Sequence, residues 1–190
     1  MLLCDGFEPG TPIAWQPVMG NGTVAMSTER AHTGSRSLRA EGTMGRTVAF
    51  MSAPIATVST GEIHLRGFYY RPSTATATDI YLARIGDGVT NSEFFGVFLG
   101  ANPGVDSGSS STFMSPELTA NTWVCVELHA AGGMLSLDVD GTQRTQTALG
   151  TFGPYSEVAF GIVADVGNPD TFLIFVDDVV ARTQPVGCTL

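Results

Sequence analysis

Apolar and polar residues alternate with a period of two along most of the chain, and no segment carries an apolar stripe with helical spacing. Such alternation is typical of half-buried β-strands, whose successive side chains point to opposite faces of a sheet. The pattern predicts strands over Val24–Ser27, Ser37–Ala40, Val48–Met51, Glu62–Tyr70, Asp79–Ile85, Phe94–Leu99, Thr122–His129, Met134–Val139, Glu157–Ala164 and Thr171–Ala181.

Turn-forming residues separate these predicted strands. Asn102-Pro103-Gly104 predicts one such turn, and Gly104–Ser111, rich in Gly and Ser, predicts a surface loop. The clearest local unit is Trp123–Arg144, in which Gly132-Gly133 and Asp140-Gly141 separate three strands and so predict an antiparallel meander. The side chains of this meander expected in the core are Val124, Val126, Leu128, Leu135, Leu137 and Val139.

Composition narrows the fold class. The 190 residues include 23 Gly and 10 Pro, 43% are hydrophobic and 14% are charged. This apolar content excludes a disordered chain, and the number of turn residues argues against a helical bundle. About a dozen short strands pack best as two sheets, and the length exceeds that of an immunoglobulin domain. We expect an all-β chain with residues 1–190 in a single domain, a two-sheet antiparallel jelly-roll β-sandwich.

Charge and hydropathy exclude two classes of partner. Nine basic residues against 18 acidic residues give a net charge of −9, and no basic run occurs. Binding to nucleic acid needs clustered cations, so we expect none. No apolar run reaches the 18 residues of a membrane-spanning helix.

Three segments resemble known carbohydrate-related sandwiches. DGFEPG with Trp15 and RAHTGSRSLRAEG is similar to the start of bacterial carbohydrate-binding jelly rolls. NTWVCVELHAAGGMLSLDVDGTQ (residues 121–143) resembles the laminin-G and concanavalin A-like lectin/glucanase superfamily. FLIFVDDVVAR (residues 172–182) resembles the last strand of both groups. The resemblance implies the jelly-roll fold, but this fold carries lectins, glycanases, lyases and adhesion modules alike.

Catalytic motifs of that superfamily are missing. Retaining glucanases carry alternating acids on one strand, and the nearest match here is Asp138-Val139-Asp140, whose second acid sits in an Asp-Gly turn. Glu62-Ile63-His64 superficially resembles the Gln-x-His of alginate lyases but lacks the Gln. Cys125 lies between valines, a setting that does not activate a thiol. We expect a non-catalytic carbohydrate-recognition or adhesion module; the alternatives are a lyase or glycoside hydrolase of the same fold and a purely structural surface module.

Sugar sites combine aromatic rings with charged and amide groups. Alternation along the strands at 62–70 and 123–129 places such side chains on one sheet face, and a second possible site is the loop end near Trp15 and Gly104–Ser111. The residues expected to bind a polysaccharide on that face are Arg66, Tyr70, Tyr81, Glu127 and His129.

A structural calcium ion is the metal expected, because the first and last strands of a jelly roll commonly lie side by side. That arrangement would let the acids of DGFE meet those of VDDV, with loop carbonyls near Gly34 completing an oxygen shell. The alternative is that these acids cap turns or pair with Arg30 or Arg36. The acids expected to hold the ion are Asp5, Glu8, Asp177 and Asp178.

The three cysteines form no CxxC pair, which excludes a zinc ribbon. The same adjacency of the terminal strands predicts a disulfide between Cys4 and Cys188. Pairing of Cys125 with either of them, and a fully reduced protein, stay open. A disulfide indicates an extracellular or cell-envelope protein whose signal sequence has been removed, and the cytoplasm is not excluded. The oligomeric state does not follow from the sequence.

Overall fold

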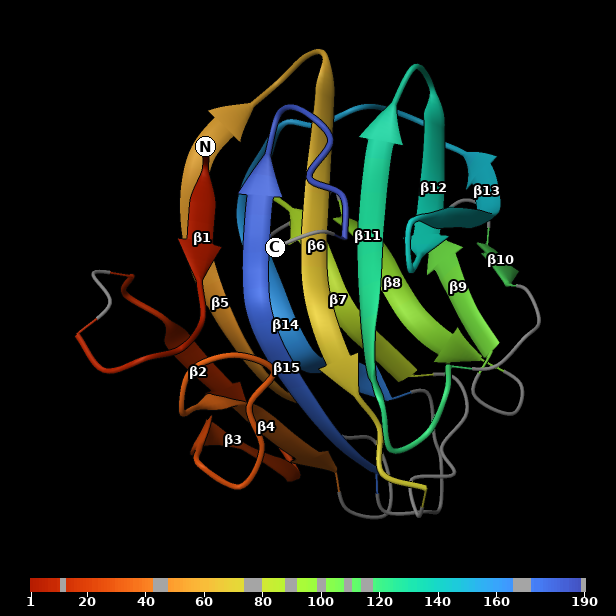
Figure 1. Cartoon of the computed structure of the whole chain (residues 1–190). Helices are drawn as coiled ribbons and strands as arrows, with labels where there is room; N and C mark the ends of the chain where they lie inside the picture. The colour runs from red at the N-terminus through yellow and green to blue at the C-terminus, as the bar shows by residue number, and fades with distance from the viewer. Residues whose placement is uncertain are drawn as a thin grey trace.

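The computed structural model describes residues 1–10, 13–42, 48–73, 80–87, 92–98, 102–107, 111–113, 118–165 and 172–188. Within them the chain is all-β, and two antiparallel sheets of eight and seven strands lie face to face (Figure 1). The two-sheet jelly-roll sandwich is therefore confirmed. Over the same residues no helix is long and apolar enough to cross a membrane.

The eight-stranded sheet, here the front sheet, lies toward the viewer in Figure 1. Its order is β13-β12-β11-β6-β15-β4-β3, and β1 pairs with the distal part of β15. Its strands are β1 (Leu3–Asp5), β3 (Gly22–Ser27), β4 (Ser37–Gly42), β6 (Glu62–Tyr70), β11 (Trp123–Ala131), β12 (Met134–Val139), β13 (Thr142–Ala148) and β15 (Phe172–Arg182).

The seven-stranded sheet, here the back sheet, has the order β10-β9-β8-β7-β14-β5-β2. Within this sheet β14 pairs with β7 on one side and β5 on the other, with irregular registers in both pairs. The strands of this sheet are β2 (Gln16–Met19), β5 (Ala49–Val58), β7 (Ile80–Gly86), β8 (Ser92–Phe98), β9 (Asn102–Asp106), β10 (Ser111–Phe113) and β14 (Tyr155–Asp165).

Each strand predicted from the alternation overlaps one strand of the structure. Asp79, Leu99 and Thr171, at the ends of three predicted strands, lie outside the described residues. The predicted turn at residues 102–104 is wrong, because these residues begin β9. There Pro103 pairs opposite Val97 of β8, so sheet pairing overrides the local turn preference.

The hydrophobic core fills the space between the two sheets and draws on both of them. The meander of β11, β12 and β13 forms as predicted, with Val126 opposite Val139 and Leu128 opposite Leu137. All six of its predicted core side chains are at most 8% exposed. Burial of this kind stabilises the fold by about 1.5–3 kcal/mol for each large side chain.

The ends of the chain meet the same sheet, but the predicted disulfide is wrong. Strand β1 does lie beside β15, with Cys4 opposite Val180. The chain continues past β15, however, and crosses the outer face of the front sheet (Figure 1). Cys188 thereby reaches Cys125 on β11, with the two Cα atoms 5.7 Å apart, and Cys4 is free and exposed.

Candidate functional site

The outer face of the front sheet carries most of the predicted ligand residues. Side chains two apart on a strand share a face, so β6 and β11 each contribute a row of five. The antiparallel register sets these rows opposite one another, pairing Tyr70 with Trp123, Arg66 with Glu127, and His64 with His129. The face is therefore a mixed surface of aromatic, charged and imidazole groups, as the alternation predicted.

The C-terminal segment covers the middle of this face. The backbone N–H groups of Val186 and Gly187 donate to the two carboxylate oxygens of Glu127, at 3.1 and 2.8 Å. The guanidinium of Arg66 donates to the carbonyls of Gly187 and Asp178. Glu127 and Arg66 are each 5% exposed. Their polar groups therefore hold the C-terminal segment in place.

The loop after β3 covers one end of the same face. The imidazole of His32 stacks on Phe68 at 3.8 Å between ring centroids, and the guanidinium of Arg30 lies 4.4 Å above the ring of Tyr70. Tyr70 is 7% exposed. Of the ligand residues predicted on the front sheet, His129 alone is more than a tenth exposed.

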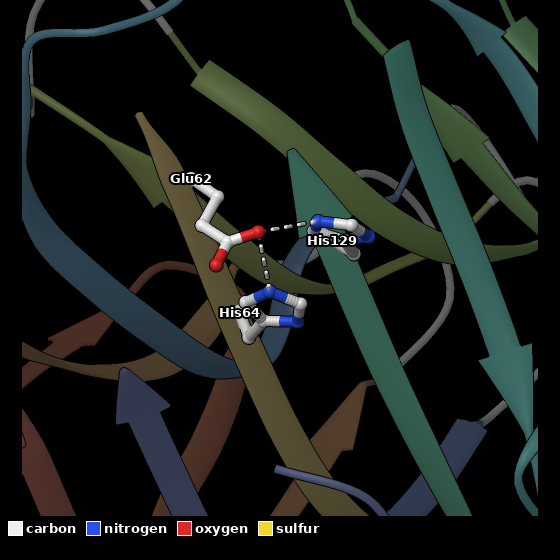
Figure 2. A group of neighbouring side chains, drawn as sticks. All are labelled: Glu62, His64 and His129. Atoms are coloured by element: carbon white, nitrogen blue, oxygen red, sulfur yellow. Dashed lines mark ion pairs between the residues drawn. The ribbon is translucent and has the colours of Figure 1, made fainter. Parts of the chain in front are cut away.

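His129 belongs to a compact cluster at the opposite end of the face. Its ring stacks on His64 at 3.9 Å between centroids, and Glu62 lies two residues before His64 on the same side of β6. One oxygen of Glu62 is 3.6 Å from Nε2 of His64 and 3.7 Å from Nε2 of His129 (Figure 2). In the described part of the chain, this is the only group of three ligand-type side chains whose donor atoms lie within 4.8 Å of one another.

Glu127 fixes the protonation of the first imidazole. Burial alone raises the pKa of Glu127, but hydrogen bonds from His64, Val186 and Gly187 outweigh it and hold that pKa below its ordinary value. Its oxygen Oε1 lies 2.6 Å from Nδ1 of His64. Because an ionised carboxylate only accepts hydrogen bonds, Nδ1 of His64 carries the proton and Nε2 keeps a free lone pair in the neutral ring.

The surroundings of the second imidazole disfavour its charged form. Burial, and then the neighbouring His64, lower the pKa of His129. Its Nδ1 lies 3.4 Å from the hydroxyl of Ser136 on β12. Asp138, which pairs opposite Glu127, has a raised pKa because burial and the charge of Glu127 both disfavour its ionised form.

Two imidazoles and a carboxylate are a donor set typical of zinc and similar ions. The alternation predicts His129 in a sugar site, and Glu62-Ile63-His64 superficially resembles a lyase motif. The missing information was the register between β6 and β11, because a slip of one residue would separate the two rings.

The acids predicted to hold calcium gather where β1 meets β15. A Cβ atom added at Gly6 would lie 3.3 Å from an oxygen of Asp178 and 3.9 Å from one of Asp177. Glu8 lies against the loop at Gly34, where a Cβ would lie 2.3 Å from its Oε1. The first and last strands meet as expected, but in the described part of the chain no three of these carboxylates bring their oxygens within 4.8 Å of one another.

Each of the four carboxylates already has hydrogen-bond donors. Asp177 accepts from the backbone N–H groups of His32 and Thr33, and Asp178 accepts from their side chains. Burial raises the pKa of Asp177 to about 6. The remaining two acids bond nearby groups: Asp5 accepts from Phe7 and Trp15, and Glu8 accepts from Ser35 and Arg36.

These donors lower the pKa of Glu8, chiefly through the hydroxyl of Ser35. Calcium needs about 6–8 oxygens and would have to displace several of these N–H groups. The predicted calcium ion therefore stays a prediction.

Tyr81 lies on β7 in the back sheet, so it cannot share a face with the other predicted ligand residues. Its hydroxyl donates to Asp106 of β9, and its ring packs on an outer apolar cluster that includes Phe50. Arg84 and Glu157 form an ion pair on the same sheet, and the guanidinium of Arg84 lies 5.7 Å from the ring of Phe50.

Known structures share this fold. A protein titled "Cellulose induced protein, Cip1" is 18% identical, with a TM-score of 0.74 over 98% of this chain and 100% of that chain. An endo-β-1,4-glucuronan lyase from the fungus Trichoderma reesei is 12% identical, with a TM-score of 0.63 over 95% and 94%. An alginate lyase, AlgAT5 of polysaccharide lyase family 7, is 9% identical, with a TM-score of 0.61 over 83% and 84%.

Sequence comparison gives no family. No protein-family profile matches the chain, and no curated protein matches it. The structural likenesses establish the fold that the sequence motifs suggested: this chain has the concanavalin A-like jelly-roll fold.

Proposed function

We propose that this protein is a non-catalytic carbohydrate-recognition module that binds a neutral polysaccharide on the outer face of the back sheet, around Tyr81. The observation that carries the proposal is the partly exposed ring of Tyr81, which packs on the outer apolar cluster. Beside it lie the hydrogen bond from Tyr81 to Asp106 and the ion pair of Arg84 with Glu157. The structural neighbours named for cellulose, glucuronan and alginate support a carbohydrate role for the fold.

The chemistry of this face suits a sugar ring. An aromatic ring stacks on the C–H face of a pyranose, and charged groups nearby exchange hydrogen bonds with its hydroxyls. Tyr81 supplies the ring, and Asp106, Arg84 and Glu157 supply the charged groups. Because these charged side chains already pair with one another, they keep a fixed geometry when a ligand arrives.

The charge of the protein favours a neutral glycan. A net charge of −9 repels uronate polymers at long range, and the sequence contains no basic run to offset it. Arg84, the cation of this face, is paired with Glu157. We therefore expect a β-glucan such as cellulose to bind better than glucuronan or alginate.

A lyase is the second candidate, because two structural neighbours are polysaccharide lyases. The candidate base of such a lyase would be His64, in the Glu62-Ile63-His64 segment that superficially resembles a lyase motif. Abstraction of a sugar proton requires direct reach to the substrate, and His64 is 2% exposed. The binding module is therefore the better explanation.

Binding to insoluble cellulose and to soluble β-glucan, glucuronan and alginate tests the proposal. We expect depletion by the neutral glucans, with Tyr81→Ala weakening binding by about tenfold or more, as loss of a stacked ring does. His129→Ala is the matched control, because it removes a partly exposed ring on the front sheet. This variant should bind the glucans as the unmodified protein does. The proposal would be refuted by an equal loss of glucan binding in both variants or by binding to none of the polymers. Release of unsaturated sugars that absorb ultraviolet light would also refute it.

The disulfide supports an extracellular or cell-envelope location for such a module, since disulfides persist in oxidising compartments. In that setting the protein would meet plant or microbial polysaccharides directly. Alkylation of the protein isolated without reductant should label Cys4 alone.

A further inference from the structure

We propose that Glu62, His64 and His129 bind one divalent transition-metal ion of the zinc type on the outer face of the front sheet. The three side chains come from neighbouring positions of β6 and β11 and bring their donor atoms within 4.8 Å of one another (Figure 2). This site is separate from the proposed sugar face, which lies on the other sheet.

The atoms that would bind the ion lack other partners. Nε2 of His64 and Nε2 of His129 are both buried without a hydrogen bond. The side chain of His64 is 3% exposed. Buried polar atoms almost always have a partner, because leaving one unpaired costs about 1–3 kcal/mol. Two such nitrogens beside one carboxylate oxygen form a set of donors that a bound cation would satisfy.

The spacing fits a small ion. A tetrahedral zinc ion with bonds of about 2.0–2.1 Å holds its ligand atoms roughly 3.3–3.4 Å apart. The two measured nitrogen–oxygen separations, 3.6 and 3.7 Å, are too long for hydrogen bonds and close to that value. The imidazole planes lie 15° apart, so the rings would have to tilt to aim both lone pairs at the ion. His129 is 32% exposed and has room to do so.

Neighbouring side chains prepare His64 as a ligand. Glu127 accepts the Nδ1 proton of His64 and so presents Nε2 to the site. A carboxylate behind a metal-binding imidazole is the usual outer-shell arrangement, and it increases the basicity of the ligand nitrogen. Two backbone N–H groups of the C-terminal segment hold Glu127 in turn. The disulfide that anchors this segment therefore also supports the site.

Local charge attracts a cation. The carboxylates of Glu62 and Glu127 lie beside the two imidazoles. The guanidinium of Arg66 is turned to the carbonyls of Gly187 and Asp178. Arg182, opposite His64 on β15, offsets part of this negative charge.

The donor set selects the type of ion. Imidazole nitrogen favours zinc, nickel and copper, whereas calcium and magnesium prefer shells of oxygen. Glu62 is 39% exposed, so the fourth position faces solvent and takes a water molecule. Three protein ligands and an open position define a site that can also accept an external donor.

Titration of untagged, chelator-treated protein with zinc chloride, followed by calorimetry, tests the proposal. We expect one zinc ion per chain and a higher melting temperature, and cobalt should give the visible spectrum of a tetrahedral complex. Glu62→Gln and His129→Gln should each weaken zinc binding by more than the ~10–100-fold cost of losing an outer-shell partner. Calcium chloride should not compete with zinc.

Glu29→Gln is the matched control, since Glu29 is an exposed acid at the other end of the front sheet. It should bind zinc as the unmodified protein does. The melting temperature without metal shows whether each variant is folded. Absence of zinc binding, or equal binding by the control and both cluster variants, would overturn the proposal and leave a water molecule as the bound species.

Discussion

The outer faces of the two sheets carry similar kinds of side chain and use them differently. On the front sheet the C-terminal segment and the loop after β3 cover Arg66, Glu127 and Tyr70, and the polar groups of Arg66 and Glu127 bond to the covering backbone. On the back sheet the described charged side chains pair with one another, as in Arg84 and Glu157, and stay partly exposed. A polar sheet face is therefore a possible binding surface only where no remote segment covers it.

Removal of the disulfide should cause the largest loss of stability, because the disulfide anchors the segment that covers the front sheet. The bridge joins cysteines 63 positions apart, and the chain-entropy relation gives about 4 kcal/mol for a loop of that size. Urea unfolding should show most of this loss in Cys125→Ala/Cys188→Ala, together with fast hydrogen exchange at Val186 and Gly187. Cys4→Ala should be neutral. Unchanged amide protection in the double variant would show that Glu127 and Arg66 hold the C-terminal segment without the disulfide.

Calcium at the corner of β1 and β15 should have the next largest effect. A hundredfold excess over the dissociation constant stabilises a folded protein by about 2.7 kcal/mol. We expect calorimetric melting temperatures to rise with calcium and Asp178→Asn to lose this rise, because the substitution removes a carboxylate ligand. The variant should still fold, since Asn tolerates the positive φ of 46° at that position. Glu41→Gln is the control. Identical melting curves in calcium and in chelator would contradict the prediction.

The buried carboxylate of Glu127 on the front sheet should contribute measurably to the free energy of unfolding. Glu127→Gln removes the charge that three donors share, and we expect a loss of about 2 kcal/mol in urea unfolding. Zinc affinity should fall in the same variant if Glu127 orients His64. A variant as stable as the unmodified protein would mean that these hydrogen bonds form only because the disulfide brings the segment there.

Two buried carboxyls should make stability depend on pH. Burial raises the pKa of Glu93 from 4.5 to about 7; Tyr155 is its one hydrogen-bond donor among the described contacts. The folded state therefore binds more protons than the unfolded state between about pH 4.5 and pH 7, so stability falls as pH rises through this window. Asp177, raised to about 6, acts in the same direction. Melting temperatures of Glu93→Gln should fall less steeply with pH, and a parallel profile would disprove the assignment.

The smallest effect on stability is expected for Glu157→Gln on the back sheet. Partly exposed ion pairs contribute about 0–1 kcal/mol, so the melting temperature should hardly change. Glucan binding should nevertheless weaken, because Glu157 lies on the proposed sugar face. A large loss of stability would show that this pair is structural, as Glu127 is on the front sheet.

The sequence predicted what depends on neighbours along the chain. Alternation placed Val126 and Leu128 in the core, and it grouped Glu127 with His129 on the opposite face. Gly132-Gly133 and Asp140-Gly141 made the turns of the meander, with positive φ at all four residues. These outcomes follow from the two-residue period and from turn sterics, which need no tertiary contact.

The sequence by itself determined the sandwich, its inward side chains and the meeting of both chain ends at one corner. The tertiary structure decided that Cys188 crosses to Cys125, that Tyr81 belongs to the other sheet, and that Glu62 and His64 meet His129. The physical reason is that period and turn residues fix which way a side chain points. Strand order, register and covering segments depend on contacts between residues far apart in the chain, and these determine what that side chain meets.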